Sequence, residues 1–294
     1  KTHDPHQLGT RIGTQHHQPP HREQHGEQQG CDEGNAQAHR CLLDQGDAAR
    51  IDAPAFLVIW TTTPWTLPAN HAISVHPELE YALVRATNAG GEVHYLVLAE
   101  ALQAGALERY EMTGDVVATT KGEKLCNSVV VLPEQGQPVG EVTNVIAEPY
   151  VQHPFALTNG APRNVIILGG AHVTADSGTG LVHTAPAHGV DDFNVWKGVS
   201  QKGIAAAPAW FDPEFTTPVD AGGVYHTAET FPSGHGLHIH KAADALFGAL
   251  KDRSRANRSL LLAHKKIRHS YPHCWRHKTP IVFRATPQWF IGME

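Results

Sequence analysis

The most informative part of the chain is Phe56-Leu-Val-Ile-Trp60, followed directly by Thr61-Thr-Thr-Pro-Trp-Thr-Leu-Pro-Ala-Asn70. The first five residues are apolar and mostly β-branched or aromatic, which is typical of a short buried strand. Pro64 and Pro68 then interrupt helical hydrogen bonding and sheet pairing, so we predict a loop at the end of that strand. Three adjacent threonine hydroxyls at its mouth suit a polar substrate or a water, although threonine is also simply a good strand residue.

The composition changes abruptly just before this strand. The first fifty residues hold seven His and eight Gln but only ten apolar residues, which is too few to bury a core. We therefore predict that residues 1–53 are disordered and that a folded domain begins at residue 54. A histidine-rich tract can bind metal, but these histidines have no repeated ligand spacing, so disorder is the stronger interpretation.

The rest of the composition indicates a globular protein. The chain has 294 residues, of which 41% are hydrophobic and 18% charged. Its longest apolar runs are far shorter than the ~20 residues that cross a bilayer, and no signal peptide opens the sequence. Four cysteines without a Cys-x-x-Cys pair favour a reducing compartment. We expect a soluble, cytoplasmic protein with no membrane partner.

Charge is distributed unevenly along the chain. The net charge of -6 argues against a surface that binds nucleic acid throughout. Residues 251–284, however, carry ten Lys or Arg against one acidic residue, so any nucleic-acid contact is expected there. On charge alone, a solvated helix face followed by a basic loop is the favoured explanation of this region.

Many short strands and few helices are expected after residue 54. The strands are predicted over 56–60, 80–86, 92–98, 116–131, 142–147, 165–169 and 180–183, and the helices over 99–109, 191–201 and 242–251. Strands and helices do not alternate regularly, which argues against a parallel βαβ sheet. We predict an α+β fold with a strand-rich, barrel-like core and a few peripheral helices.

A second stretch that suits chemistry is Gly178-Thr-Gly-Leu-Val-His-Thr-Ala-Pro-Ala-His-Gly-Val-Asp-Asp-Phe193. Its glycines permit close backbone approach, and a strand is expected to end at His183. Together with His188, Asp191 and Asp192, this residue offers groups for acid-base chemistry or ligand binding. The two aspartates are equally explained as residues favoured at a helix N-terminus. No zinc spacing, Gly-x-Ser-x-Gly element or phosphate-binding loop is present.

Three ordered stretches of the chain together resemble the isoleucyl-tRNA synthetases, which are class I enzymes. They are the threonine loop with Trp60, the Gly178–Phe193 stretch, and Ser270-Tyr-Pro-His-Cys-Trp-Arg-His-Lys-Thr-Pro-Ile-Val-Phe-Arg-Ala-Thr-Pro-Gln-Trp-Phe290. The resemblance runs from about Ala55 to the end of the chain. It implies an inserted aminoacyl-tRNA editing domain over 54–269 and a segment over 270–294 that returns toward the catalytic core.

The resemblance also implies an activity, the hydrolysis of tRNA(Ile) mischarged with valine, and a set of site residues. The threonine loop lines the pocket for the aminoacyl end, where hydroxyls hydrogen-bond the attacking water or the terminal ribose. His183 borders the valine side chain and the ester, and Asp192 holds the α-ammonium group. No covalent nucleophile is assigned. The predicted catalytic residues are Thr62, Thr63 and His183, and the predicted substrate-binding residues are Thr61, Asn70 and Asp192.

The chain also departs from the synthetases. The His-Ile-Gly-His and Lys-Met-Ser-Lys-Ser signatures are missing, so we expect neither aminoacylation nor a cofactor. The expected partners are the 3′ acceptor end of an aminoacyl-tRNA and the remainder of a parent synthetase. Residues 1–53 match nothing expected before the threonine loop, and we interpret them as a mis-framed or truncated gene product, with a true disordered extension as the alternative.

Two further expectations follow from these departures. Cys274-x-x-His277 resembles a zinc half-site of some relatives, but no upstream cysteine pair is evident, so no bound metal is predicted. The alternative to an active deacylase is a folded but inactive fragment that binds the acceptor end of tRNA. Comparing the hydrolysis of Val-tRNA(Ile) with that of Ile-tRNA(Ile) distinguishes these two functions.

Overall fold

The computed structural model describes residues 55–126, 150–153, 155, 164–202, 215, 217–229, 231–252, 260–266 and 271–286. Residues 1–53 and the strand expected over 142–147 lie outside these ranges. The domain boundaries given above therefore stay predictions.

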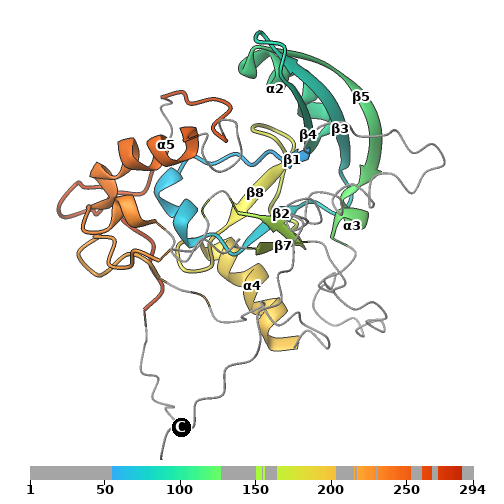
Figure 1. Ribbon diagram of the computed structural model, residues 1–294. Coiled ribbons are helices and arrows are strands. Elements are labelled where there is room, and N and C mark those ends of the chain that lie inside the picture. The colour runs from blue at the N-terminus through green and yellow to red at the C-terminus, as the bar shows by residue number, and fades with distance from the viewer. Residues whose placement is uncertain are drawn as a thin grey trace, which may run out of the picture. The chain divides into compact units, whose positions relative to one another are not determined.

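The first sheet has four strands in the order β1-β4-β3-β5 (Figure 1). Its strands are β1 (Ala55–Leu57), β3 (Glu80–Asn88), β4 (Val93–Ala99) and β5 (Met112–Lys121). Strand β1 is parallel to β4, while β3 pairs antiparallel with β4 and β5. The Asn88 side chain accepts hydrogen bonds from the backbone N–H groups of Gly90 and Glu92, each at 2.9 Å. The strands predicted over 80–86 and 92–98 are confirmed, and this turn joins them in a hairpin.

The second sheet has the order β6-β7-β2-β8. Its strands are β2 (Ala72–Val75), β6 (Tyr150–Gln152), β7 (Asn164–Gly169) and β8 (Leu181–Thr184). Strand β2 lies at its centre, parallel to β7 and antiparallel to β8. Strands β7 and β8 match the predictions, whereas β2 and β6 were not predicted.

Helices are few and mostly short. They are η2 (Glu100–Leu102), α2 (Gln103–Tyr110), α3 (Gly122–Leu125), α4 (Val190–Lys202) and α5 (Ala243–Lys251), with the 3-10 helices η1 (Pro64–Ala69), η3 (Pro232–Gly234) and η4 (Ile239–Lys241). The three predicted helices are confirmed. None of the helices in the described ranges is long and apolar enough to cross a membrane.

Two predictions of secondary structure were wrong. The strand expected over 116–131 ends at Lys121, because the chain turns into α3 at Gly122, where a Cβ atom would lie 2.0 Å from the carbonyl oxygen of His76. The expected loop after Trp60 contains the 3-10 helix η1. Pro64 begins that helix, where a missing N–H group costs no hydrogen bond.

Strand β7 of the second sheet is buried on both faces. Val165 and Ile167 of β7 join the hydrophobic core that contains β3 and β4. Ile166 and Leu168 point to the other face, where they pack with Trp196. Trp196 belongs to α4, the helix that lies beside β7 in Figure 1. This period of two is what strand geometry requires, and it explains why β7 is a continuous apolar run.

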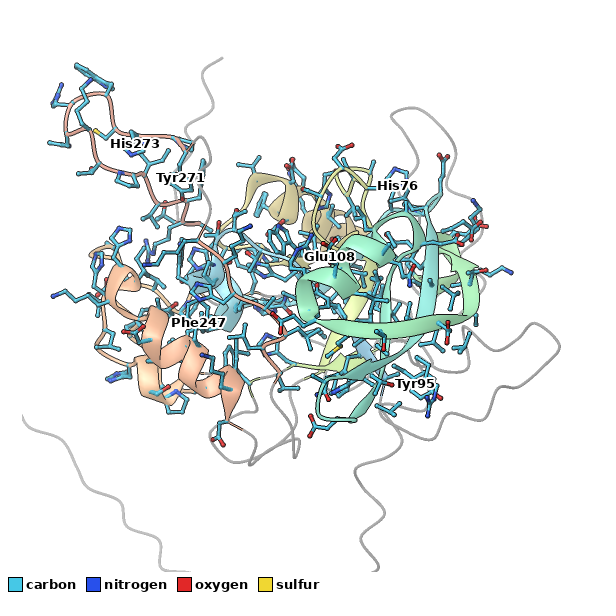
Figure 2. All side chains as sticks on the ribbon, turned by 90° about the horizontal axis from the view of Figure 1, so that it is seen from above. His76, Tyr95, Glu108, Phe247, Tyr271 and His273 are labelled. Carbon is cyan, nitrogen blue, oxygen red and sulfur yellow. The ribbon has the colours of Figure 1, made fainter. Side chains whose placement is uncertain are left out.

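A third hydrophobic cluster lies under η1. Leu67 of η1 packs there with α5 and with buried aromatic residues that include Phe231. Phe247 of α5, which is labelled in Figure 2, also contacts the ring of His264, with ring centroids 4.1 Å apart. Helix η1 is therefore held by a hydrophobic cluster that is separate from the core between the two sheets.

The predicted α+β, strand-rich class is confirmed. In the described residues the strands form two four-stranded sheets and do not close into a barrel. The sheets nevertheless share one core, since residues of β2, β7 and β8 pack with residues of β1, β3 and β4.

Candidate functional site

Strand β8 forms hydrogen bonds with the residues at both ends of the threonine loop, which comprises residues 61–70. Before the loop, the Trp60 N–H group donates to the Leu181 carbonyl oxygen at 3.2 Å. After it, the His71 N–H group donates to the Thr184 carbonyl oxygen at 2.8 Å. The loop is therefore fixed beside the strand that carries His183, although more than one hundred residues separate the two in sequence.

Two glycines before β8 permit close packing, Gly178 against Trp60 and Gly180 against Ala99 of β4. Gly178 and Gly180 have positive φ angles of 80° and 73°, which L-residues with side chains rarely adopt. A Cβ atom on Gly178 would lie 2.8 Å from the Trp60 ring, and one on Gly180 would lie 2.4 Å from the Cβ atom of Ala99. The Tyr81 hydroxyl donates to the Gly180 carbonyl oxygen at 2.7 Å. The glycines thus serve the close packing that the sequence predicted.

His183 is buried at the end of β8 and lies against η1. Only 6% of its surface is exposed. Its Nε2 atom is 3.0 Å from the Thr66 hydroxyl, which also lies 2.8 Å from the Thr63 carbonyl oxygen. The Nδ1 atom of His183 is buried and has no hydrogen-bond partner in the described part of the chain. Burial, with a smaller contribution from His188, lowers the pKa of His183 to about 4, so the ring is neutral at pH 7.

The second histidine of this region, His188, is held by the C-terminal segment. Its Nδ1 atom is 3.0 Å from the Phe283 carbonyl oxygen, and its ring meets the Trp65 ring edge to face at 4.9 Å. Burial lowers the pKa of His188 as well. Because a carbonyl oxygen only accepts, His188 must carry its proton on Nδ1 when neutral.

Asp192 reaches back from the first turn of α4 to the end of β8. Its Oδ2 atom accepts the Ala185 N–H group at 2.8 Å. The carboxyl group fits only because residue 189 is glycine, since a Cβ atom there would lie 2.8 Å from Oδ2. Burial raises the pKa of Asp192, and the hydrogen bond from Ala185 opposes that rise. Asp191 is exposed on the same turn.

The three adjacent threonines occupy different environments. The Thr61 hydroxyl accepts the Thr63 N–H group at 2.9 Å and thereby shapes the turn. Thr62 is exposed, whereas Thr61 and Thr63 are half-buried. Of these predicted residues, Thr63 is connected to His183, through the hydroxyl of Thr66.

Asn70 closes the loop from inside the protein. It is 3% exposed, and its Nδ2 atom donates to the Ala72 carbonyl oxygen at 2.8 Å. This bond joins the end of η1 to the start of β2. The predicted role of Asn70 in substrate binding stays a prediction, and the structure adds a role in shaping the loop.

Residues 283–285 contact the site from the C-terminal side. The Ala285 N–H group donates to the Ala187 carbonyl oxygen, and the Arg284 Nε–H group donates to the Val219 carbonyl oxygen, each at 2.8 Å. Phe283, through its carbonyl oxygen at His188, and Ala285 therefore hold the loop after β8, while Arg284 ties the same segment to Val219. Sequence patterns do not reveal this contact, because backbone atoms make most of it.

The Cys274 and His277 pair lies on a turn of the same segment. The two side chains are 3.3 Å apart from Sγ to Nδ1, and Figure 2 labels the neighbouring Tyr271 and His273. The described residues contain no group of three or more His, Cys, Asp or Glu side chains that could hold a metal ion.

Acid should destabilise the folded chain through His183. Its pKa of about 4 lies below its ordinary value of 6.5, so the unfolded chain binds more protons between these values. The free energy of unfolding should therefore be undiminished above about pH 6.5 and fall by about 3 kcal/mol as the pH drops through 4. Chemical denaturation at a series of pH values measures this slope.

The matched control for this prediction is His183→Gln. Glutamine has no group that titrates in this range, so the slope in the variant should be shallower. If the variant loses stability as steeply as the original chain, other groups cause the acid sensitivity.

No model of a known protein family matches the chain, but individual proteins do. The chain is 43% identical over 242 residues to the isoleucine--tRNA ligase of Dechloromonas aromatica, a match that covers 82% of the chain and 21% of that protein. It is 41% identical over 266 residues to the isoleucine--tRNA ligase of Thiobacillus denitrificans, covering 90% of the chain and 23% of that protein. The predicted resemblance is confirmed, and the chain spans about a fifth of the length of these relatives.

Solved structures offer a more distant likeness. The editing domain of the P. falciparum cytosolic leucyl-tRNA synthetase is 14% identical, with a TM-score of 0.38 over 51% of this chain and 48% of that one. The corresponding domain from P. knowlesi is 12% identical, with a TM-score of 0.36 over 51% and 52% of the two chains.

Proposed function

We propose that this chain, a homologue of one segment of the isoleucine--tRNA ligases, is an editing domain that hydrolyses tRNA(Ile) mischarged with valine. One observation carries the proposal. A loop rich in threonine is fixed to β8 beside the buried neutral His183, and the Asp192 carboxylate is bound to the Ala185 N–H group, two residues after that histidine. Its partners are then the acceptor end of an aminoacyl-tRNA and the remainder of a synthetase, in the cytoplasm.

The groups at this site match the chemistry of an aminoacyl ester. Every such ester carries a cationic α-ammonium group beside the ester carbonyl, and a carboxylate binds such a cation through charge-assisted hydrogen bonds. Asp192 already uses Oδ2 to accept the Ala185 N–H group, so Oδ1 is the atom that we assign to the ammonium.

The hydroxyl groups of the loop serve the water and the ribose. Thr62 is exposed and Thr63 is half-buried, so both are placed to hydrogen-bond groups that enter from solvent. Such hydrogen bonds orient a water toward the ester carbonyl and stabilise the charge that develops on it. We assign no covalent intermediate, so the reaction is a direct hydrolysis that releases valine and free tRNA.

Selection at this site has to be steric. Valine and isoleucine differ by one methylene group, and a second site that admits only the smaller product removes errors that a single hydrophobic pocket cannot prevent. Asp192 and the threonines bind features that the two esters share. The buried, neutral ring of His183 is the group that we assign to the wall of the pocket.

The test is hydrolysis of Val-tRNA(Ile) and Ile-tRNA(Ile) by the purified full chain. We expect the valyl ester to be hydrolysed faster than in buffer alone and the isoleucyl ester to be spared. If neither rate exceeds that in buffer, the chain is not a deacylase by itself. Measured binding of uncharged tRNA(Ile) in that case would support the alternative of an inactive fragment that binds the acceptor end.

A further inference from the structure

The Thr66 hydroxyl lies between two polar groups but has only one hydrogen to donate. Its Oγ1 atom is 2.8 Å from the Thr63 carbonyl oxygen and 3.0 Å from Nε2 of His183. The carbonyl oxygen accepts and never donates, so the first contact requires the hydroxyl hydrogen. The second contact is then a hydrogen bond only if Nε2 carries a hydrogen and Thr66 accepts it.

We propose that Thr66 is a positioning residue that holds His183 as the neutral tautomer protonated on Nε2, which leaves Nδ1 as the acceptor offered to the substrate or to its water. The inference rests on the proposed function for its second half, whereas the tautomer itself follows from the contacts of Thr66.

The opposite tautomer fits these surroundings less well. With the proton on Nδ1, the Thr66 hydroxyl would have to turn away from Thr63 and donate to Nε2. The ring would then bury an N–H donor that has no acceptor among the described residues. Buried N–H groups without a partner are rarer in proteins than acceptors with unused lone pairs. The tautomer protonated on Nε2 keeps both bonds of Thr66 and leaves only a lone pair unused.

The unpartnered Nδ1 atom of His183 connects this tautomer with function. The atom is buried, and in the described part of the chain no donor reaches it. A buried acceptor without a donor costs free energy, which a hydrogen bond from a bound ligand or water recovers. The low pKa of His183 keeps the ring neutral, so at pH 7 the choice between tautomers decides which nitrogen accepts.

No sequence pattern distinguishes Thr66 from the residues around it. It stands inside the threonine loop but outside the run of three adjacent threonines, and η1 turns it toward β8. The Thr66 N–H group also bonds to the Thr63 carbonyl oxygen, at 3.0 Å, which fixes the side chain at the start of η1.

The experiment is a nitrogen-15 NMR spectrum of the full chain with labelled histidines, in which His183→Gln identifies the His183 signals. We expect Nε2 protonated and Nδ1 unprotonated at pH 7 in the original chain. Thr66→Val removes the hydroxyl at nearly constant volume and should produce a mixture of tautomers. Thr66→Ser keeps the hydroxyl and should restore the single tautomer.

Hydrolysis of Val-tRNA(Ile) is the second readout. Thr66→Val should lower the rate by roughly tenfold, the size expected when one hydrogen bond is lost, and Thr66→Ser should recover most of it. If Thr66→Val fails to fold, Thr66→Ala removes the same hydroxyl without adding volume.

Three outcomes would overturn the inference. They are a proton on Nδ1 in the original chain, an equal mixture of tautomers there, and an unchanged tautomer after the hydroxyl is removed. The spectrum determines the tautomer of His183 whether or not the chain is a deacylase. Absence of hydrolysis would therefore contradict the proposed function, whereas the other tautomer would contradict the positioning role of Thr66.

Discussion

Asp192→Ala is expected to slow the hydrolysis of Val-tRNA(Ile) about ten- to a hundredfold. The reason is the loss of a charge-assisted hydrogen bond to the α-ammonium group, worth roughly 1.5 to 3 kcal/mol. The alanine variant also leaves the Ala185 N–H group without the acceptor that it has at 2.8 Å. Part of its effect would therefore be structural, and a second variant is needed.

Asp192→Asn separates the two roles of this side chain. An asparagine keeps an oxygen for the Ala185 N–H group but removes the negative charge. Burial raises the pKa of Asp192, which means that the charged form is the costly one in the folded protein. The neutral variant should therefore keep its melting temperature. Its loss of hydrolysis should nevertheless approach that of the alanine variant.

The matched control is Asp191→Asn, one residue earlier in the same turn of α4. Asp191 is exposed and carries the same charge at the same end of the helix. If the helix dipole were the source of the effect, the two aspartates would contribute about equally. Equal losses at both positions would therefore remove the ammonium role of Asp192, while a much smaller loss at Asp191 supports it.

Strands with strong local signals could be predicted from the sequence. Two apolar runs separated by a turn of Asn and Gly indicate the β3-β4 hairpin in the sequence. The Asn88 side chain closes this turn through hydrogen bonds to nearby backbone N–H groups. Strand β7 is a plain apolar run, because both of its faces are buried. In these elements the residues that determine the structure are close neighbours.

Strand β2 could not be predicted in that way. It is four residues long, follows a proline-rich helix and contains Ser74, so neither length nor alternation marks it. Its stability comes from pairing with β7 and β8, about one hundred residues away. The Ser74 hydroxyl is tolerated inside because it bonds to the Thr184 hydroxyl at 2.6 Å. Only the folded chain reveals that partner.

The two sequence stretches that form the candidate site could be predicted, but the contacts that join them could not. The threonine loop and the stretch around His183 were both identified, yet the hydroxyl that joins them belongs to Thr66. The Phe283 carbonyl oxygen at His188 is a backbone atom, and any residue type at position 283 provides one. Contacts of this kind depend on the path of the chain, which residue types do not encode locally.

His183→Ala is expected to let the chain hydrolyse correctly charged Ile-tRNA(Ile). The extra methylene of isoleucine must be excluded by a wall, because the ammonium, ester and ribose are the same in both substrates. The His183 ring is 6% exposed and is fixed by the Thr66 hydroxyl, so it does not move aside easily. Forcing a methylene group into a packed site costs about 1 to 3 kcal/mol, so removing the ring should raise the isoleucyl rate about five- to a hundredfold.

The competing role for His183 is that of general base. A base with a pKa of about 4 is weak at pH 7, which makes this role the less favoured one. It predicts a different result, since proton transfer from water is common to both esters and both rates would fall together. His183→Gln retains volume but cannot act as a base of the same kind, so a wall predicts preserved selectivity in this variant.

Both deacylation rates must therefore be measured for both variants, with thermal melting as a check on folding. A gain for Ile-tRNA(Ile) in the alanine variant, with Val-tRNA(Ile) slowed by no more than the roughly tenfold expected from the loss of one hydrogen bond at Nδ1, supports the wall. A parallel loss for both esters in both variants supports the base. Unchanged rates for both esters would show that His183 does not contact the substrate, and the exclusion of isoleucine would then have to come from other residues around η1 and β8.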